Sequence, residues 1–395
     1  MLLRFVQKPV LTIGRTFLVL MALMGSPSLV SAQKWHWTTE QIDAAGADSS
    51  LVADSQGNLH ISYYFPVDGQ LRYGFRGAKN SRWFKMELDH GYGDFFTQIA
   101  VDVKGNPYIC YTPFILKMAR FDGRHWIVER VDPTGGDIFY ACSVQVGPGG
   151  APQVSWYRDS EPVYLRYAIL KDRVWVAQTA DPENMPGKWH SMTLDGKGLP
   201  HLSYVTLFKW QLRYSYYDGK SWMHTVVDSP DLHHTDDQLG MGNSLALDSD
   251  GNPMISYYDL GSLKLARFVD NKWKIEVVTQ FSSTGKMAGW KTYRSRIVLD
   301  GGGNPHIAFV SPRGLEHAWR EGGTWRTQLV IATSGFVVFD CGMTIDTSDT
   351  LYISYTDPAD KSLRLAVGRQ PLVSRTVNDG KRSTLDAAGL PLPLR

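Results

Sequence analysis

Residues 248–258 read DSDGNPMISYY, and the same phrase returns as DSQGNLHISYY at 54–64 and as DGGGNPHIAF at 300–309. Alignment of the whole chain on the first letter of this phrase gives seven anchor positions, which follow one another at intervals of 45 to 53 residues. The anchors are Asp54, Asp102, Gly147, Asp195, Asp248, Asp300 and Asp346. A repeat of this length indicates that one supersecondary unit recurs along the chain and buries its faces against its neighbours.

Each repeat has the pattern of several short β-strands. A small turn follows the anchor, and then apolar and polar residues alternate, as in MISYYD at 254–259. A third strand comes next, such as LKLARF at 263–268, and a tryptophan begins a fourth. In the turn, the Asp can accept backbone N–H bonds, the Gly can take a positive φ, and the Pro can start a strand without losing a ladder bond. The repeated letters are therefore predicted to be structural rather than catalytic.

Seven repeats contain the anchor, but only six contain the tryptophan of the fourth strand, namely Trp83, Trp126, Trp175, Trp222, Trp273 and Trp325. The missing strand has a counterpart near the start of the chain, where WHWTTEQID at 35–43 has the same form as WKIEVVT at 273–279. Four strands per period of about 40 to 50 residues are typical of a β-propeller. A sandwich of such sheets would leave long exposed edges, and an open solenoid would give the N-terminal strand no partner. We therefore predict an all-β fold, a seven-bladed β-propeller whose N-terminal strand closes the last blade.

The two ends of the chain lack the repeat. Residues 1–32 combine three basic residues with a short apolar run and a small-residue cleavage site, which is the pattern of a secretory signal peptide. The run is too short to span a bilayer. We expect a signal peptide at 1–32, the propeller at 33–369 and a loose C-terminal extension at 370–395. The expected location is secreted or periplasmic, without stable membrane insertion.

The charge of the chain bears on its partners. The leader contains three of the 41 basic residues and none of the 39 acidic ones, which leaves 38 against 39. Nucleic-acid binding normally requires a basic face, so a nearly neutral protein is predicted not to bind nucleic acid.

Three cysteines, Cys110, Cys142 and Cys341, allow at most one internal disulfide. Cys142 and Cys341 hold equivalent places in repeats three and seven, on opposite sides of the expected ring. A disulfide requires Cα atoms within about 7 Å. We therefore expect buried thiols.

The segment before the fourth strand resembles a known motif. FDGRHW at 121–126, YDGKSW at 217–222 and VDNKW at 269–273 are similar to the Asp-box, S-x-D-x-G-x-x-W, of sialidase-type (BNR-repeat) propellers. Here the Asp and Gly are adjacent and the Ser is missing from its place. The resemblance implies an exported propeller of bacterial style. It does not imply sialidase activity, because the arginine triad of sialidases has no clear counterpart.

A functional site is expected where the repeats differ. The connections from each fourth strand to the next first strand, and from each second to third strand, meet on one side of the ring, which we call the loop face. The first strands begin there with a chemically mixed set: Ser49, Thr97, Cys142, His190, Asn243, Ser295 and Cys341. One position earlier stand Asp48, Phe96, Ala141, Trp189, Gly242, Arg294 and Asp340. This unrepeated ring predicts a central pocket.

One of the two longest connections raises the question of a metal. The loop at 228–243 contains His233, His234, Asp236 and Asp237, residue types that bind zinc or calcium. Sequence neighbours rarely all point at one ion, so a solvated acidic loop is the favoured interpretation, as it is for DSDGN at 248–252. We predict no cofactor, with calcium or zinc as the alternative.

The other long connection is rich in basic and aromatic residues. It supplies Trp290, Tyr293, Arg294 and Arg296, which together with Arg158 could hold a carboxylate or sulfate by charged hydrogen bonds. With His190 as base and Tyr293 as acid, this set would suit a lyase that abstracts a proton beside a uronate carboxylate. The alternative is that the arginines pair with Asp48 or Asp340 and seal the channel.

Two functions follow from these residues. The first is a binding or scaffold module that takes a glycan or protein through the loop face. The alternative is a polysaccharide-active enzyme with its site at the channel mouth, and a lyase is favoured over a hydrolase. The predicted catalytic residues are His190, Tyr293 and Arg294, and the predicted binding residues are Asp48, Arg158, Trp189, His233, Asn243, Trp290, Arg296 and Asp340. Aromatic residues make up 12% of the chain, and either a packed core or a sugar-binding surface would account for them.

Overall fold

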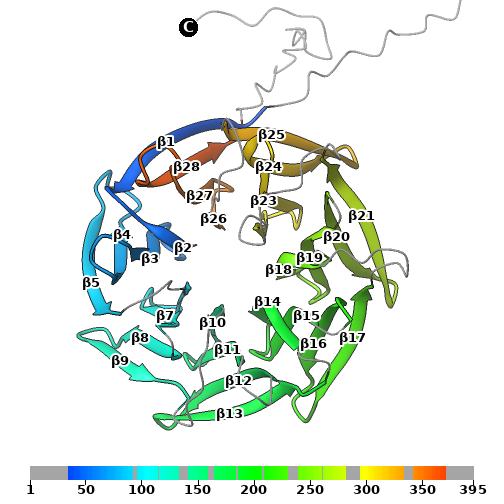
Figure 1. Ribbon diagram of the computed structural model, residues 1–395, viewed down its shortest axis with the longest axis horizontal. Helices are drawn as coiled ribbons and strands as arrows, with labels where there is room; N and C mark the ends of the chain where they lie inside the picture. The colour runs from blue at the N-terminus through cyan, green and yellow to red at the C-terminus, as the bar shows by residue number, and fades with distance from the viewer. Residues whose placement is uncertain are drawn as a thin grey trace, which may run out of the picture. The chain divides into compact units, whose positions relative to one another are not determined.

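The computed structural model describes residues 34–370 apart from 92–95, 114, 133–140, 159–163, 184–185, 207–208, 230–238, 260, 282–293 and 333–340. The described residues form seven four-stranded antiparallel sheets, the blades, which stand in a ring (Figure 1). The prediction of an all-β, seven-bladed propeller is confirmed. The predicted signal peptide at 1–32 and all but the first residue of the predicted extension at 370–395 lie outside the described residues, so these boundaries stay predictions.

Each blade runs from an innermost to an outermost strand. The innermost strands are β2 (Ala47–Ala53), β6 (Thr97–Val101), β10 (Cys142–Val146), β14 (Pro186–Leu194), β18 (Met241–Leu247), β22 (Ser295–Leu299) and β26 (Cys341–Ile345). The second strands are β3 (Leu59–Phe65), β7 (Pro107–Tyr111), β11 (Pro152–Arg158), β15 (Pro200–Thr206), β19 (Pro253–Asp259), β23 (Pro305–Ser311) and β27 (Leu351–Thr356). We number the blades one to seven in this order.

The outer half of each blade follows the same order. The third strands are β4 (Gln70–Arg76), β8 (Lys117–Phe121), β12 (Tyr164–Lys171), β16 (Leu212–Tyr217), β20 (Ser262–Val269), β24 (Gly314–Glu321) and β28 (Leu363–Arg369). The outermost strands of blades one to six are β5 (Phe84–His90), β9 (Trp126–Arg130), β13 (Val174–Asp181), β17 (Trp222–Asp228), β21 (Lys272–Gln280) and β25 (Thr324–Ala332). The outermost strand of blade seven is β1 (His36–Asp43).

The repeated phrase is a hairpin turn between the first and second strands. One carboxylate oxygen of Asp54 accepts the backbone N–H groups of Gln56 at 2.9 Å and Asn58 at 2.8 Å. Gly57 takes a φ of 78°, where a side chain would be strained. The same bonds recur at Asp102 and Asp248. The anchor residues are therefore structural, as predicted.

The N-terminal strand closes the ring. β1 pairs antiparallel with β28, from His36 opposite Arg369 to Asp43 opposite Leu363. Just before β1, the backbone N–H and C=O of Trp35 bond to the Gln328 side chain of blade six, both at 2.9 Å. The two ends of the folded region therefore share one sheet, which leaves no blade without a neighbour.

The tryptophans of the outer strands join neighbouring blades. Trp126 of blade two meets Tyr73 of blade one edge to face, with ring centroids 5.0 Å apart. Trp222 of blade four meets Tyr167 of blade three in the same way, at 5.5 Å. Such pairs are favourable beyond the apolar area that they bury. The repeated tryptophan therefore serves packing between blades.

A second contact between blades, which we call the latch, recurs around the ring. An Asp near the end of one outermost strand accepts a hydrogen bond of 2.5 to 2.6 Å from a Tyr in the second strand of the next blade. The residue paired with that Tyr in the third strand is an Arg or Lys that reaches the same carboxylate. The latches are Asp43–Tyr63–Arg72, Asp89–Tyr111–Lys117, Asp181–Tyr204–Arg213 and Asp228–Tyr257–Lys264.

The latch at Asp43 keeps its carboxylate charged. Burial alone would raise the pKa of Asp43, but hydrogen bonds from Lys85, Tyr63 and the backbone of Ala44 outweigh it, so the pKa lies below its ordinary 3.8. Burial and the neighbouring carboxylate raise the pKa of Tyr63 above its ordinary value. The ionised Asp and the neutral Tyr are thus the stable pair at neutral pH.

Nothing in the described part of the chain forms a helix long and apolar enough to cross a bilayer.

Closure by β1 can be tested by truncation. We expect a protein that begins after Asp43 to unfold about 10 °C or more below one that begins at Lys34, because β28 loses its partner strand and exposes an edge. Thermal unfolding followed by circular dichroism and light scattering measures both proteins. Equal unfolding temperatures would contradict the closure.

The latch can be tested by removing one charge. We expect Asp43→Asn to lower the free energy of unfolding by about 2–4 kcal/mol at pH 7, because Tyr63, Arg72 and Lys85 lose their ionised acceptor. The matched control is Asp68→Asn, since Asp68 contacts the same Arg72 at 3.7 Å from an exposed position, where the loss should stay under about 1 kcal/mol.

Comparison of wild type with Asp43→Asn also tests how the stability that the latch contributes depends on pH. A carboxyl group with a lowered folded-state pKa stabilises the protein fully above its unfolded pKa, and this contribution is lost as pH falls through the folded value. The difference between wild type and Asp43→Asn should therefore shrink as pH drops below 3.8. Urea unfolding at pH 7, 4 and 3 measures it, and a difference that does not change with pH would rule out an ionised Asp43 in the latch.

Candidate functional site

The innermost strands surround a cavity of about 280 Å³. It is lined by side chains from all seven of these strands or from the residue just before them, and the lining is polar and charged as well as aromatic. The predicted site residues along it are Asp48, Trp189, His190, Asn243, Arg294 and Arg296. The structure thus brings six of the predicted residues to one cavity.

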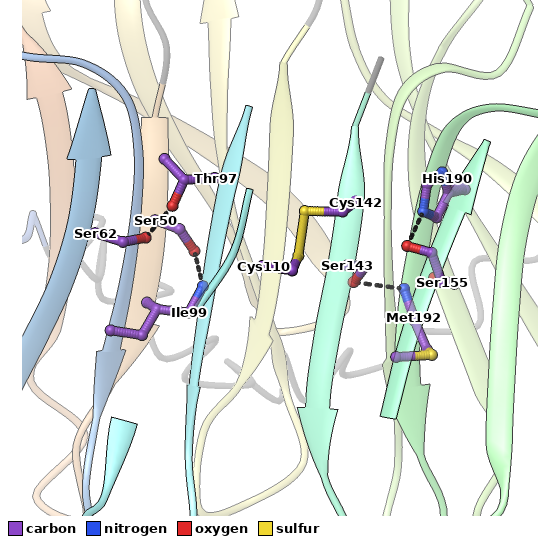
Figure 2. Close-up of a disulfide and its surroundings, with 10 residues drawn as sticks. All are labelled: Ser50, Ser62, Thr97, Ile99, Cys110, Cys142, Ser143, Ser155, His190 and Met192. Carbon is purple, nitrogen blue, oxygen red and sulfur yellow. Dashed lines mark hydrogen bonds between the residues drawn. A yellow bond between two sulfur atoms is a disulfide. The ribbon is translucent and has the colours of Figure 1, made fainter. Parts of the chain in front are cut away.

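The predicted pocket residues at which the innermost strands begin, such as Ser49 and Asn243, link neighbouring blades. For Ser49, Thr97, Asn243 and Ser295 the partner is the residue at the serine position of the second strand in the preceding blade. Ser203 donates to Asn243 at 2.6 Å, Ser256 bonds Ser295 at 2.8 Å, and Ser354 bonds Ser49 at 2.9 Å. Thr97 donates to Ser62 (Figure 2). We call these contacts the inner ring.

The disulfide takes the place of one of these contacts. Cys110 and Cys142 are bonded, with Cα atoms 6.2 Å apart, and join blades two and three (Figure 2). The expectation of buried thiols is therefore wrong for these two residues and holds for Cys341. The signal was in the repeat: Cys110 stands at the serine position of its own second strand, and Cys142 is its inner-ring partner in the next blade. Cys142 and Cys341 occupy the same position in different blades, whereas the bonded cysteines occupy different positions in neighbouring blades.

A further set of contacts ties several of the innermost strands to the next one around the ring. Ser50 accepts the backbone N–H of Ile99 at 3.2 Å, and Ser143 accepts that of Met192 at 3.3 Å (Figure 2). Ser191 and Ser244 do the same for Leu245 at 3.1 Å and Ile297 at 3.2 Å. These hydroxyls satisfy N–H groups on the innermost edges, which have no further strand to pair with.

Unusual backbone geometry directs side chains to the mouth of the cavity. Asp48 and Trp189 have φ values of 47° and 48°, and Gly242 and Ala141, at the same position of other blades, have 56° and 36°. In blades one and four the strand register shifts here, as at a β-bulge. A bulky residue with positive φ is uncommon, and such positions cluster at functional sites.

The mouth holds an ion pair on an aromatic ring. The Arg294 guanidinium lies 3.8 Å from the Asp48 carboxylate and 5.5 Å from the centre of the Phe96 ring. Both charged side chains are about one-fifth exposed. The pairing with Asp48 that we considered for an arginine is therefore present. Arg296 donates to the backbone C=O of Ser295 at 3.1 Å.

His190 and Asn243 are held by the scaffold. The His190 ring nitrogens lie 3.0 Å from the C=O of Gly187 and 3.1 Å from that of Ser155. Burial lowers the pKa of His190 to about 4, although the two carbonyls oppose the shift. The ring is therefore neutral at pH 7 and can donate to only one of the two carbonyls. Asn243 donates to the C=O of Trp189 and to that of Gly240, the latter at 3.0 Å.

Several predicted site residues cannot be placed. Tyr293, His233, Trp290 and Asp340 lie outside the described residues, and Arg158 ends β11 with a side chain that is not described. Within the described ranges, no three His, Cys, Asp or Glu side chains meet in a way that could hold a metal ion. The alternative of a zinc or calcium site at 233–237 therefore rests on residues that the structure does not describe.

No protein-family model and no curated protein matches the chain. Solved structures do match. An ulvan lyase of the polysaccharide lyase family PL25 shares 10% identity at a TM-score of 0.58, covering 83% of this chain and 95% of its own. A fungal alcohol oxidase of the AA5 family shares 9% sequence identity at a TM-score of 0.55, and the match covers 86% of this chain and 76% of the oxidase. AofleA from Arthrobotrys oligospora shares 9% sequence identity at a TM-score of 0.50, and the match covers 76% of this chain and 91% of AofleA. At such identities the likeness establishes the propeller fold alone.

The disulfide can be tested against the inner ring. We expect the double variant Cys110→Ser/Cys142→Ser to fold, because serines meet at the equivalent places of other blades, but to lose about 3–4 kcal/mol of stability with the cross-link. Reductant should lower the unfolding temperature of wild type and of a Cys341→Ser control, and leave that of the double variant unchanged. A wild-type protein that is insensitive to reductant would contradict the bond.

Proposed function

We propose that this protein is an exported glycan-binding propeller that holds an anionic sugar at the loop-face mouth of its central cavity. The observation that carries the proposal is the convergence of Asp48, Phe96, Trp189 and Arg294 on one cavity. Arginine recognises carboxylate and sulfate groups by charged hydrogen bonds, the aspartate can accept sugar hydroxyls, and the two aromatic rings offer apolar faces.

The size and charge of the cavity support a small anionic ligand group. About 280 Å³ lies just below the usual range of small-molecule sites, roughly 300–1,000 Å³, and suits one sugar ring rather than a length of polysaccharide. The described lining contains two arginines, Arg294 and Arg296, and one aspartate, Asp48. A protein partner would need roughly 800 Å² on each side, which a cavity of this size does not supply.

Export is supported by the disulfide. The bond between Cys110 and Cys142 is of the kind that persists in oxidising compartments, which favours the secreted or periplasmic location predicted from the leader. The likeness to sialidase-type propellers remains part of the proposal. Asp122 and Asp218, in the Asp-box-like segments, each accept two backbone N–H bonds within their hairpin turns, which supports a structural role for these segments.

A lyase is the second candidate, because His190 lines the same cavity as Arg294. A neutral imidazole is the form that a base requires, but a pKa of about 4 makes it a weak one. Both of its nitrogens also lie within hydrogen-bond distance of backbone carbonyls. The fold does not fix the function, since the similar structures include two enzymes of different chemistry, a polysaccharide lyase and an alcohol oxidase.

The proposal can be tested with a panel of neutral, uronate and sulfated polysaccharides. We expect wild type to retard an anionic member in affinity electrophoresis and Arg294→Gln to bind it about ten- to a hundredfold more weakly, as the loss of one charge-assisted hydrogen bond predicts. The matched control is Arg326→Gln on the outermost strand β25, which should bind like wild type.

Product formation separates the two candidates. We expect intact polysaccharide after prolonged incubation with the wild-type protein. Unsaturated products that depend on Arg294 would replace the binding function with the lyase, and a protein that retards no glycan on the panel would refute the proposal.

A further inference from the structure

The 13 tryptophans divide into three groups. Seven stand at the outer strands, where the repeat requires them: Trp37, Trp83, Trp126, Trp175, Trp222, Trp273 and Trp325. Trp35, Trp156 and Trp319 are at most 8% exposed and belong to the core between blades. The other three are Trp189, Trp210 and Trp290, and none of them stands at a position where the repeat has a tryptophan in other blades. Trp290 lies outside the described residues. Trp189 and Trp210 lie at the loop face, so packing of the repeat does not account for them.

Two of these tryptophans meet at the mouth of the cavity. Trp189 lies in β14 and lines the cavity, and Trp210 lies in the connection between β15 and β16. Their ring centroids are 6.2 Å apart and their planes are inclined by 37°. Both residues are partly exposed, unlike the tryptophans of the core. The pair therefore forms an aromatic surface beside the proposed sugar site.

The backbone under both rings is held in an unfavourable conformation. Trp189 and Trp210 have φ values of 48° and 49°, in the left-handed region that large residues avoid. Hydrogen bonds stabilise both positions. The Asn243 side chain donates to the C=O of Trp189 and accepts from Ser203. Next to Trp210, the backbone C=O of Gln211 accepts the N–H of Thr206 at 3.0 Å, and the backbone N–H of Gln211 donates to the Thr206 hydroxyl at 3.3 Å.

Such backbone strain persists only where the surroundings enforce it, and it is concentrated at ligand sites. Asn243, which we predicted to bind ligand, has its side-chain amide in contact with Trp189, Gly240 and Ser203. Its contacts make it a positioning residue for the Trp189 ring.

We propose that Trp189 and Trp210 form a second sugar subsite, an aromatic platform on which a pyranose ring stacks next to the anionic sugar held at Arg294. The inference rests on the proposed function and extends it, because the ligand becomes an oligosaccharide of at least two residues. The cavity has room for about one ring, and the next ring of a chain leaving it passes over the platform. Indole rings present an apolar, electron-rich face that suits the C–H groups of a sugar ring.

The test is a glycan array of neutral, uronate and sulfated saccharides one to six residues long, followed by titration calorimetry of the sugars that bind. We expect Trp210→Ala to weaken oligosaccharide binding about three- to tenfold, the equivalent of one lost aromatic contact, and to leave monosaccharide binding unchanged. Trp210→Tyr should restore most of the affinity, because it keeps an aromatic face. The control is Trp325→Phe, on the far rim, which should bind every saccharide like wild type.

Each outcome decides between the two proposals. If Trp210→Ala and Trp210→Tyr are folded and bind oligosaccharides like wild type, the platform is refuted while the site at Arg294 stands. If both variants lose monosaccharides and oligosaccharides equally, Trp210 only supports the mouth and the second subsite is again refuted. If wild type binds nothing on the array, the proposed function fails and the platform with it.

Discussion

The buried hydrogen bond between an aspartate at the end of one blade and a tyrosine in the next is the contact on which the ring depends. No single four-stranded sheet can bury both of its faces, so each blade is stable only against its neighbours. At Asp43 and Tyr63 this contact joins the first and last blades, since Asp43 belongs to β1 and Tyr63 to β3. The strand that completes blade seven therefore also anchors blade one, and closure and blade packing form one structural unit.

The inner ring joins neighbouring blades at the channel, as the latch joins them near the outermost strands. These contacts limit which side chains can bind a ligand. A pair of small polar side chains joins successive blades at most positions, and the Cys110–Cys142 disulfide replaces one such pair with a covalent bond. Side chains that link blades are not available to a ligand. What remains for binding is the position one residue earlier, where bulged strands direct Asp48 and Trp189 to the mouth, together with the connections of the loop face.

The candidate site was predictable in part. The position of each residue in the repeat placed Asp48, Trp189, His190, Asn243 and Arg294 around one channel, and the structure brings them to one cavity. The repeat could not show which of them face the cavity and which link blades, because the positive φ values at Asp48 and Trp189 break the alternation on which side-chain direction was judged. Trp210 was overlooked because its connection has no counterpart in other repeats, and only the folded chain brings it to Trp189.

By itself, the sequence determined the number of blades, the strands within each blade, the hairpin turn at every anchor and the N-terminal strand that closes the ring. These features depend on local periodicity and on contacts that repeat in every unit, so seven copies of the same pattern reinforce one interpretation. Only the tertiary structure decided the partner of Cys142, the roles of His190 and Asn243, and the meeting of Arg294 with Asp48. Each of these contacts joins residues from different blades. The contacts of His190, of Asn243 with Trp189 and of Arg294 occur once and leave no period in the sequence, whereas the partner of Cys142 follows from the inner ring, which only the folded chain reveals.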